Sequence, residues 1–139
     1  VAQGVRSLLP REGEVLVVEA PGTGADGPRF AAALVLDAEG DPGYDQVRWQ
    51  VDAAPDEVLV VHVLATLPQF HGRGYARQLL EGAIAAAREA GAKALRLDTF
   101  TTNGRAQGLY ESCGFANCGV YEDFYPHLGR AGVLYEFAL

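Results

Sequence analysis

Residues 71–76, His-Gly-Arg-Gly-Tyr-Ala, lie between an apolar run at residues 58–67 and an amphipathic run that begins at Ala76. The apolar run is rich in Val and Leu, which predicts a central strand. In the amphipathic run the apolar residues recur at helical spacing, and Gly91 follows where a helix would end. A glycine-rich turn from a strand into a helix gathers backbone N–H groups at the helix N-terminus, where a phosphate binds.

The glycines of this turn, Gly72 and Gly74, have no Cβ, so an anion can approach their amides, and Arg73 adds a cation beside them. The helix N-terminus contributes about 0.3–1 kcal/mol to the binding of an anion. Turns of this composition also occur without a ligand. The turn is not a Walker loop, because the Gly-Lys-Ser/Thr ending is absent, and it lacks the third glycine of a dinucleotide-binding turn.

A second informative segment covers residues 103–115, Asn-Gly-Arg-Ala-Gln-Gly-Leu-Tyr-Glu-Ser-Cys-Gly-Phe. Asn103 predicts the N-cap of a short helix, and Gly114 predicts its end. Tyr110 lies on that helix. A phosphate-binding turn together with a positioned phenol favours a transfer reaction on a nucleotide-like cofactor.

The rest of the chain predicts further strands and loops. Strands are expected at residues 14–19, 29–36, 47–51, 94–99, 116–121 and 133–138, and loops at residues 21–28, 37–45 and 122–132. Residues 1–9 predict the tail of a helix or a loop. This order is typical of a mixed α/β sheet with helices on both faces, and a chain of 139 residues is expected to form one domain.

Composition narrows the function further. A net charge of −7 argues against general nucleic-acid binding, which depends on a basic face. Since no apolar stretch approaches the ~20 residues of a membrane span, we expect a cytoplasmic protein with no membrane partner. Cys113 and Cys118 predict reduced thiols, and no Cys/His spacing predicts a metal site. The sequence contains no Met, so we expect a trimmed or processed chain.

Residues 61–115 resemble the Gcn5-related N-acetyltransferases, the GNAT family. The family motif Asn-x-x-Ala-x-x-Leu-Tyr-x-x-x-Gly-Phe is complete at residues 103–115, and the strand end Val-Leu-Ala-Thr-Leu-Pro at residues 63–68 is also similar. The phosphate motif Gln/Arg-x-x-Gly-x-Gly/Ala fits in two registers, one from Gln69 and one from His71. We prefer the register from His71, which keeps the family's distance from the strand-ending proline. It places His71 where the family usually has Gln or Arg.

The resemblance implies a GNAT-like fold in which acetyl-CoA binds in a split between two parallel strands, here residues 58–67 and 94–99. Backbone groups of a bulge at residues 64–66 would pair with the pantetheine, and residues 72–76 would hold the pyrophosphate. The family's opening strand and helix have no counterpart in this sequence, which predicts an N-terminal truncation or a second polypeptide that supplies them. The residues expected to contact the co-substrate are Leu64, Ala65, Thr66, His71, Gly72, Arg73, Gly74, Tyr75, Ala76, Asn103, Ala106 and Tyr110.

The implied reaction is the attack of a neutral amine on the thioester, which needs a base, donors for the oxyanion and an acid for the leaving thiolate. The resemblance assigns Tyr110 as the acid, since the phenol pKa of about 10 lies near that of a thiol. The oxyanion donor is expected to be a backbone N–H near Ala65 or Thr66. Asp98 and His62 are the candidate bases, and water or another group is the third alternative.

Glu122, Asp123 and Tyr125 are expected to rim the acceptor side, where the acidic pair would hold a cationic amine. An ordinary polar loop with packed aromatic residues is the alternative interpretation of the same segment. The acceptor itself is a small-molecule or peptide amine that the sequence does not identify. The incomplete front of the fold would favour a homodimer.

Two other functions compete with an N-acetyltransferase. One is a non-catalytic acyl-CoA-binding module, such as a sensor or one half of a tandem enzyme, and the missing front strand favours it. The other is a nucleotide-binding protein unrelated to CoA, against which the complete motif at residues 103–115 counts.

Overall fold

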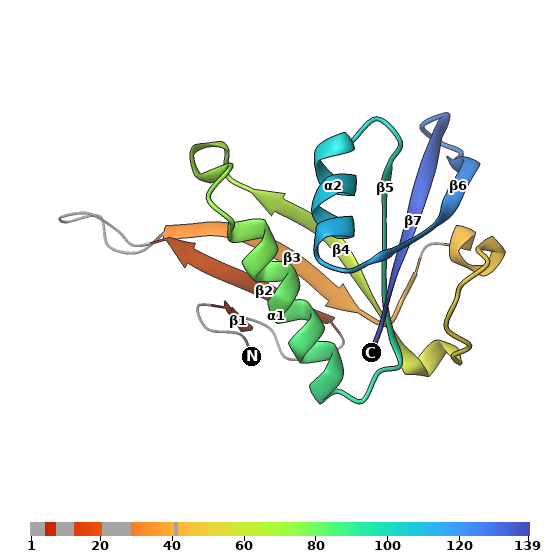
Figure 1. The fold of residues 1–139 in the computed structure, drawn as a ribbon, viewed down its shortest axis with the longest axis horizontal. Helices are drawn as coiled ribbons and strands as arrows, with labels where there is room; N and C mark the ends of the chain where they lie inside the picture. Colours follow the sequence, from red (N-terminus) through yellow and green to blue (C-terminus); the bar gives the residue numbers. More distant parts are fainter. Residues whose placement is uncertain (1–4, 8–12, 21–28, 41) are drawn as a thin grey trace. The chain divides into compact units, whose positions relative to one another are not determined.

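A computed structural model describes residues 5–7, 13–20, 29–40 and 42–139 of the chain (Figure 1). The chain forms two compact units, one made of Val1–Asp37 with Val61–Ala90 and the other of Ala38–Val60 with Gly91–Leu139. Strand β4 (Val58–Thr66) begins in the second unit and ends in the first. The expectation of a single domain stays a prediction.

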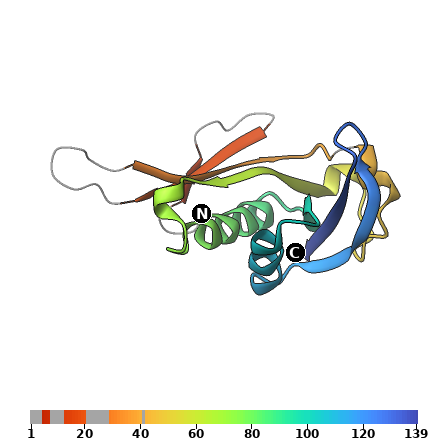
Figure 2. The same cartoon turned by 90° about the horizontal axis from the view of Figure 1, so that it is seen from above.

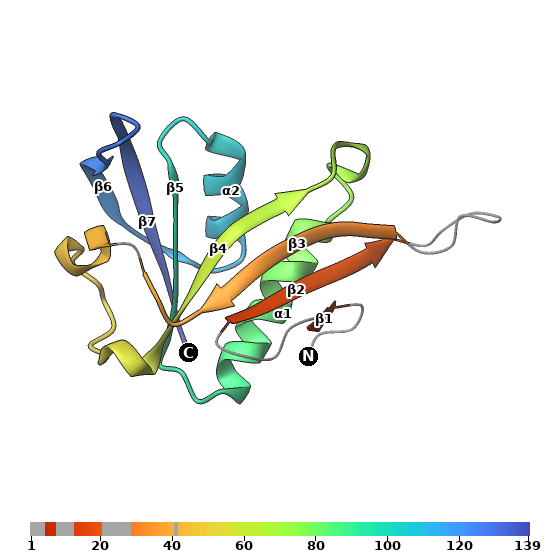
Figure 3. The same cartoon turned by 180° about the vertical axis from the view of Figure 1, so that it is seen from behind.

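The first unit contains antiparallel strands in the order β1-β2-β3, with β4 beside β3. Helix α1 (Tyr75–Glu89) packs on β1, β2 and β3, and Figure 2 shows it along one side of these strands. The first three strands are β1 (Val5–Ser7), β2 (Gly13–Ala20) and β3 (Arg29–Asp37). Figure 3 shows the same strands from the opposite side, with α1 behind them.

The apolar face of α1 forms the core of this unit with the strands. Its buried residues recur at the helical spacing expected from the sequence: Leu79, Leu80, Gly82, Ala83, Ile84 and Ala87. A Cβ on Gly82 would lie 2.8 Å from Cγ1 of Val5, so glycine is required for the close approach of β1. The helix ends before Gly91, whose φ of 78° is left-handed, as predicted.

The second unit contains strands in the order β4-β5-β7-β6. The first three residues of β4 pair in parallel with β5, whereas the β5–β7 and β6–β7 pairs are antiparallel. The elements of this unit are β5 (Ala94–Phe100), α2 (Gly104–Ser112), β6 (Ala116–Tyr125), β7 (Arg130–Ala138) and the 3₁₀ turns Pro42–Gln46 and Pro55–Glu57. The parallel and antiparallel pairs confirm the predicted mixed α/β class.

Strand β7 presents a different core on each face. Tyr135 contacts Tyr110 of α2, whereas its neighbour Leu134 belongs to a cluster on the other face with Tyr44 and Val47. Successive side chains of a strand alternate between faces, which explains this division. Figure 2 shows α2 and residues 42–57 on opposite sides of β7.

The strand predicted at residues 47–51 is wrong, since these residues form bends and irregular chain. Two of their backbone N–H groups bond a side chain rather than a neighbouring strand: Gln50 and Val51 donate to Oε1 of Glu136 at 2.9 and 3.0 Å. Trp49 packs on the guanidinium of Arg96, 4.4 Å from the ring centroid. The alternation in the sequence therefore reflects an irregular segment packed on a sheet.

Two other boundaries differ from the predictions. Val5–Ser7 form a strand where a helix tail or loop was expected. This strand precedes residues 14–19, the first strand that the sequence predicted. Strand β6 continues to Tyr125 through the segment predicted as a loop, because positive φ values at Gly119 and Asp123 absorb two irregularities in its pairing. The loop predicted at residues 21–28 lies outside the described residues.

Within the described part of the chain, no helix has the length and apolar character needed to cross a membrane. In the described part of the chain, Cys113 and Cys118 are not joined by a disulfide.

Candidate functional site

The end of β4 contains an unusual backbone conformation. Val63 has a φ of 49°, a left-handed value that β-branched residues rarely adopt, and its side chain is 76% exposed. Such a residue interrupts the regular pleat of a strand, as a bulge does. The sequence predicted the bulge at residues 64–66, and the structure places the irregular residue immediately before them.

The turn after β4 has the geometry predicted for an anion-binding turn. Gly72 and Gly74 have φ values of 77° and 82°, and a Cβ on either would meet no atom within 4 Å. Packing therefore does not require glycine at these positions, whereas the backbone conformation does. Gly74 is the N-cap of α1, which begins at Tyr75, so the free N–H groups of a 15-residue helix start here.

His71, the residue that departs from the family pattern, closes this turn onto the strand. Its Nε2 lies 3.0 Å from the carbonyl oxygen of Thr66. Arg73 stacks over Phe70, whose ring in turn meets the edge of Tyr75 at 5.7 Å. These contacts hold the turn at residues 71–76 in shape from both ends.

His62, one of the two candidate bases, is paired within the first unit. Its Nε2 lies 2.9 Å from Oδ1 of Asp37, and both side chains are 26% exposed. The carboxylate orients the imidazole toward β3. His62 is therefore already engaged by a charged neighbour.

In the second unit, Asn103 performs the predicted N-cap role. Its Oδ1 accepts a hydrogen bond from the N–H of Ala106 at 3.1 Å. The side chain of Gln107 donates to the carbonyl oxygens of Phe100 and Thr101, which ties α2 to the end of β5. This network fixes the orientation of α2 and of the tyrosine that it carries.

Tyr110 is 6% exposed and packs among the rings of Phe115 and Tyr135. Burial, followed by the charge of Asp98, raises the pKa of Tyr110 to about 12. The sequence-based expectation of a pKa near that of a thiol is therefore wrong for the folded protein. The phenol keeps its proton throughout the neutral and mildly alkaline range, so it can donate a hydrogen bond there.

Asp98, the other candidate base, is held by two phenols. Tyr44 donates to its Oδ1 at 2.6 Å, and Tyr125 donates to its Oδ2. The structure thus brings Asp98 together with Tyr125, which the sequence assigned to the acceptor side. The sequence missed Tyr44, which lies in a polar Pro-Gly-Tyr-Asp turn with no periodic signal.

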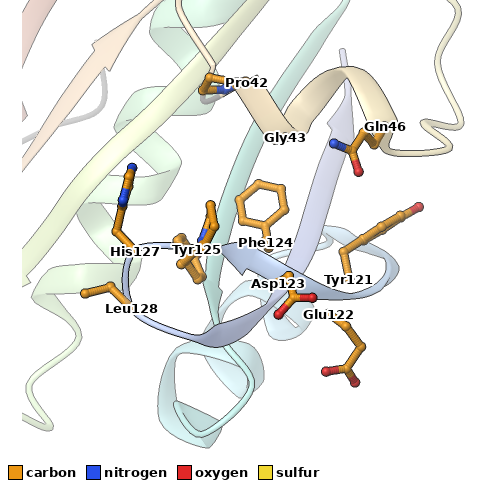
Figure 4. A pocket seen from close by; sticks show the side chains of 11 residues that line it. Pro42, Gly43, Gln46, Tyr121, Glu122, Asp123, Phe124, Tyr125, His127 and Leu128 are labelled. Atoms are coloured by element: carbon orange, nitrogen blue, oxygen red, sulfur yellow. The ribbon is translucent and has the colours of Figure 1, made fainter.

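A pocket of about 390 Å³ lies between the turn Pro42–Gln46 and the end of β6 with its hairpin (Figure 4). Glu122, Asp123 and Tyr125, the predicted acceptor-side residues, all line it. In Figure 4 the Phe124 ring rises toward Gly43, whereas the Glu122 carboxylate points away from the turn.

Phe124 sits between two glycines that have no room for a side chain. A Cβ on Gly43 would lie 2.7 Å from Cε1 of Phe124, and a Cβ on Gly132 would lie 2.9 Å from its Cδ2. The ring also lies near Tyr44 and Tyr125, at centroid distances of 5.9 and 5.0 Å. The pocket wall is therefore built from an ordered aromatic cluster.

Comparison with protein families assigns residues 30–115 to the acetyltransferase (GNAT) family. The matched residues make up more than half of the chain. An uncharacterised protein of Mycobacterium leprae is 38% identical over 74 residues, which are 53% of this chain and 20% of that protein. A ribosomal protein bS18-alanine N-acetyltransferase of Haemophilus ducreyi is 36% identical over 63 residues, 45% of this chain and 43% of the relative. The chain thus spans less than half the length of either curated relative.

Solved structures agree in fold. An acetyltransferase of Bacillus subtilis in complex with CoA superposes with a TM-score of 0.69 at 20% identity, covering 94% of this chain and 79% of that one. At this identity the likeness establishes the fold alone.

Proposed function

Because this chain belongs to the GNAT family of acetyltransferases, we propose that it transfers an acetyl group from acetyl-CoA to a primary amine. The observation that carries the proposal is the turn at residues 71–76, where two left-handed glycines open a 15-residue helix. Backbone N–H groups at such a helix start suit a pyrophosphate, and the missing Cβ atoms leave it room. The solved Bacillus subtilis neighbour with bound CoA supports the choice of co-substrate.

In this proposal residues 72–76 hold the pyrophosphate, and His71 keeps the turn against β4 through Thr66. His71 thus contributes by positioning the backbone, where the family usually has a longer polar side chain. The irregular backbone at Val63 and the residues that follow it, Leu64, Ala65 and Thr66, would pair with the pantetheine.

The proposed reaction forms one covalent bond and breaks another. The neutral amine nitrogen attacks the thioester carbonyl carbon, a C–N bond forms, and the C–S bond breaks as the electrons return to sulfur. The nitrogen loses one proton to a base. The leaving CoA sulfur accepts a hydrogen bond from Tyr110 and takes up one proton from water, which the proton released by the nitrogen replaces.

The raised pKa of Tyr110 defines how it can act. With a pKa of about 12 it is a weaker acid than a thiol, whose reference pKa is about 8.5. Tyr110 therefore contributes by donating a hydrogen bond to the sulfur while negative charge develops.

The proposed base acts through a bound water. Both oxygens of Asp98 accept phenolic hydrogen bonds, and Nε2 of His62 pairs with Asp37. A hydrogen-bonded partner does not stop a carboxylate or an imidazole from accepting a proton, so we propose a bound water that relays the amine proton to one of them.

The test is thiol release from acetyl-CoA in the presence of a panel of primary amines, with acetylated product identified by mass. Release that depends on the amine supports the proposal. Tight CoA binding without turnover on any amine would favour the non-catalytic acyl-CoA-binding module, and preference for ATP over CoA would contradict both.

A further inference from the structure

The pocket beside residues 121–128 is held in shape by the residues around it. Tyr44 and Tyr125 share the Asp98 carboxylate, so the turn Pro42–Gln46 and the end of β6 are tied to the same strand. The N–H of Arg48 also donates to the hydroxyl of Tyr121 at 3.0 Å. A pocket tied at three points needs little reorganisation when a ligand enters.

The lining of this pocket is aromatic on the inside and acidic at its edge. Phe124, fixed between Gly43 and Gly132, provides a ring beneath the turn in Figure 4, and Tyr121 also lines the pocket. None of the described residues that line the pocket is Lys or Arg, whereas Glu122 and Asp123 both line it. The chain as a whole carries a net charge of −7. A cationic ligand with an apolar body matches these features.

The size of the pocket limits the ligand. A volume of about 390 Å³ lies within the range of about 300–1,000 Å³ typical of small-molecule sites. Aromatic walls gain most from contact with another flat apolar group.

We propose that this pocket receives the body of the acceptor and selects an amine attached to a flat apolar group over a slender aliphatic amine. The inference rests on the proposed function, because it makes the pocket the acceptor side of the transfer reaction. Phe124 and the turn Pro42–Gln46 determine this specificity, and Asp123 attracts the ammonium group.

The binding test uses two probes, 2-phenylethylamine and n-butylamine, titrated calorimetrically into the full chain with and without CoA. We expect 2-phenylethylamine to bind at least tenfold more tightly. Equal affinities, or no saturable binding of either amine under both conditions, would overturn the inference.

Two tryptophan variants locate the binding. Gln46 is exposed and lines the pocket, so Gln46→Trp fills the space without disturbing the core. Gln50 is exposed in the same segment but does not line the pocket, which makes Gln50→Trp a matched control. The preference for 2-phenylethylamine should fall to within twofold in the first variant and persist in the second. If Gln46→Trp leaves the preference for 2-phenylethylamine unchanged, the amine binds elsewhere. In that case Phe124→Leu, which removes the ring, also leaves the preference unchanged.

A second pair of variants tests the charge. Asp123 has a φ of 57°, a conformation that Asn also tolerates, so Asp123→Asn removes one charge without backbone strain. Glu81→Gln removes one charge from an exposed position on α1. Both amines should bind several-fold more weakly to Asp123→Asn only. Equal affinities in the two variants would remove Asp123 from the site.

Thiol release separates this inference from the proposed function. Selective amine binding with no release from acetyl-CoA would refute the transfer reaction and leave the pocket standing. Release that is equally efficient with n-butylamine would refute the pocket and leave the transfer reaction standing.

Discussion

Arg96 and Glu136 face each other on neighbouring strands, and Nε of Arg96 donates to Oε2 of Glu136 across 2.8 Å. Their side chains are 11% and 1% exposed. The other carboxylate oxygen accepts the N–H groups of Gln50 and Val51, so one buried acid connects two strands to an irregular segment.

Removing that charge should be strongly destabilising. Glu136→Gln leaves the Arg96 guanidinium buried without a counter-charge, and breaking such a pair costs about 3–5 kcal/mol. Urea unfolding measures the loss. As a control, Lys93→Ala breaks the ion pair between Lys93 and Glu57, whose side chains are 55% and 34% exposed, respectively. This substitution should lower the free energy of unfolding by under about 1 kcal/mol. Equal losses in the two variants would contradict this interpretation of the buried pair.

Tyr110→Phe tests the proposed hydrogen-bond donor to the CoA sulfur. Loss of the hydroxyl should lower kcat by about 10²-fold or more, because the developing thiolate loses its donor, with little change in CoA affinity. Steady-state thiol release and CoA titration provide the two values. Tyr135→Phe is the matched control, since the hydroxyl of Tyr135 bonds Glu111 and has no proposed part in the reaction. Full activity in Tyr110→Phe would remove this residue from the mechanism.

The buried tyrosines predict how stability depends on alkaline pH. Burial raises the pKa of Tyr110 from 10.0 to about 12, and burial with the Glu111 hydrogen bond raises the pKa of Tyr135 as well. Above pH 10 the unfolded chain loses these protons while the folded chain keeps them, so the free energy of unfolding falls as pH rises. Tyr110 alone accounts for about 3 kcal/mol over its two-unit range.

The measurement for this pH effect is urea unfolding at intervals from pH 8.5 to pH 12. Tyr110→Phe should show a shallower decline than the unaltered chain, because it lacks one of the titrating groups. Parallel declines would show that Tyr110 titrates alike in the folded and unfolded chain.

Gly74→Ala tests the anion-binding turn, with Gly91→Ala as its counterpart at the other end of α1. Both glycines have left-handed φ values, 82° and 78°, and a Cβ added to either would meet no atom within 4 Å. Each substitution should therefore cost about 1–2 kcal/mol, the penalty for a left-handed alanine. Only Gly74→Ala should weaken CoA binding, by about fivefold or more, at the helix N-terminus. Calorimetric titration with CoA distinguishes the two, and equal CoA affinities would argue against pyrophosphate binding at this turn.

The elements that carry a local signal were predictable. The β-branched run of β4, the left-handed glycines before α1 and the Asn103 cap of α2 each depend on neighbouring residues, so their residue types and spacing suffice. The strand predicted at residues 47–51 was wrong, because alternation of apolar and polar residues also arises where an irregular chain packs on a sheet.

The chemistry of the side chains in the second unit depended on distant residues. Asp98 meets Tyr44 and Tyr125, which are 54 and 27 positions away in the chain. The acidity of Tyr110 changed through burial beside the rings of Phe115 and Tyr135. No local pattern encodes such neighbours.

The amino-acid order alone thus determined the strand, turn and helix that suit a pyrophosphate, because those conformations follow from backbone preferences over a few residues. Only the tertiary structure decided which carboxylates and phenols are already paired, how tightly Tyr110 retains its proton, and where Phe124 forms a pocket wall. Those properties arise from burial and from contacts between chain segments that folding alone brings together.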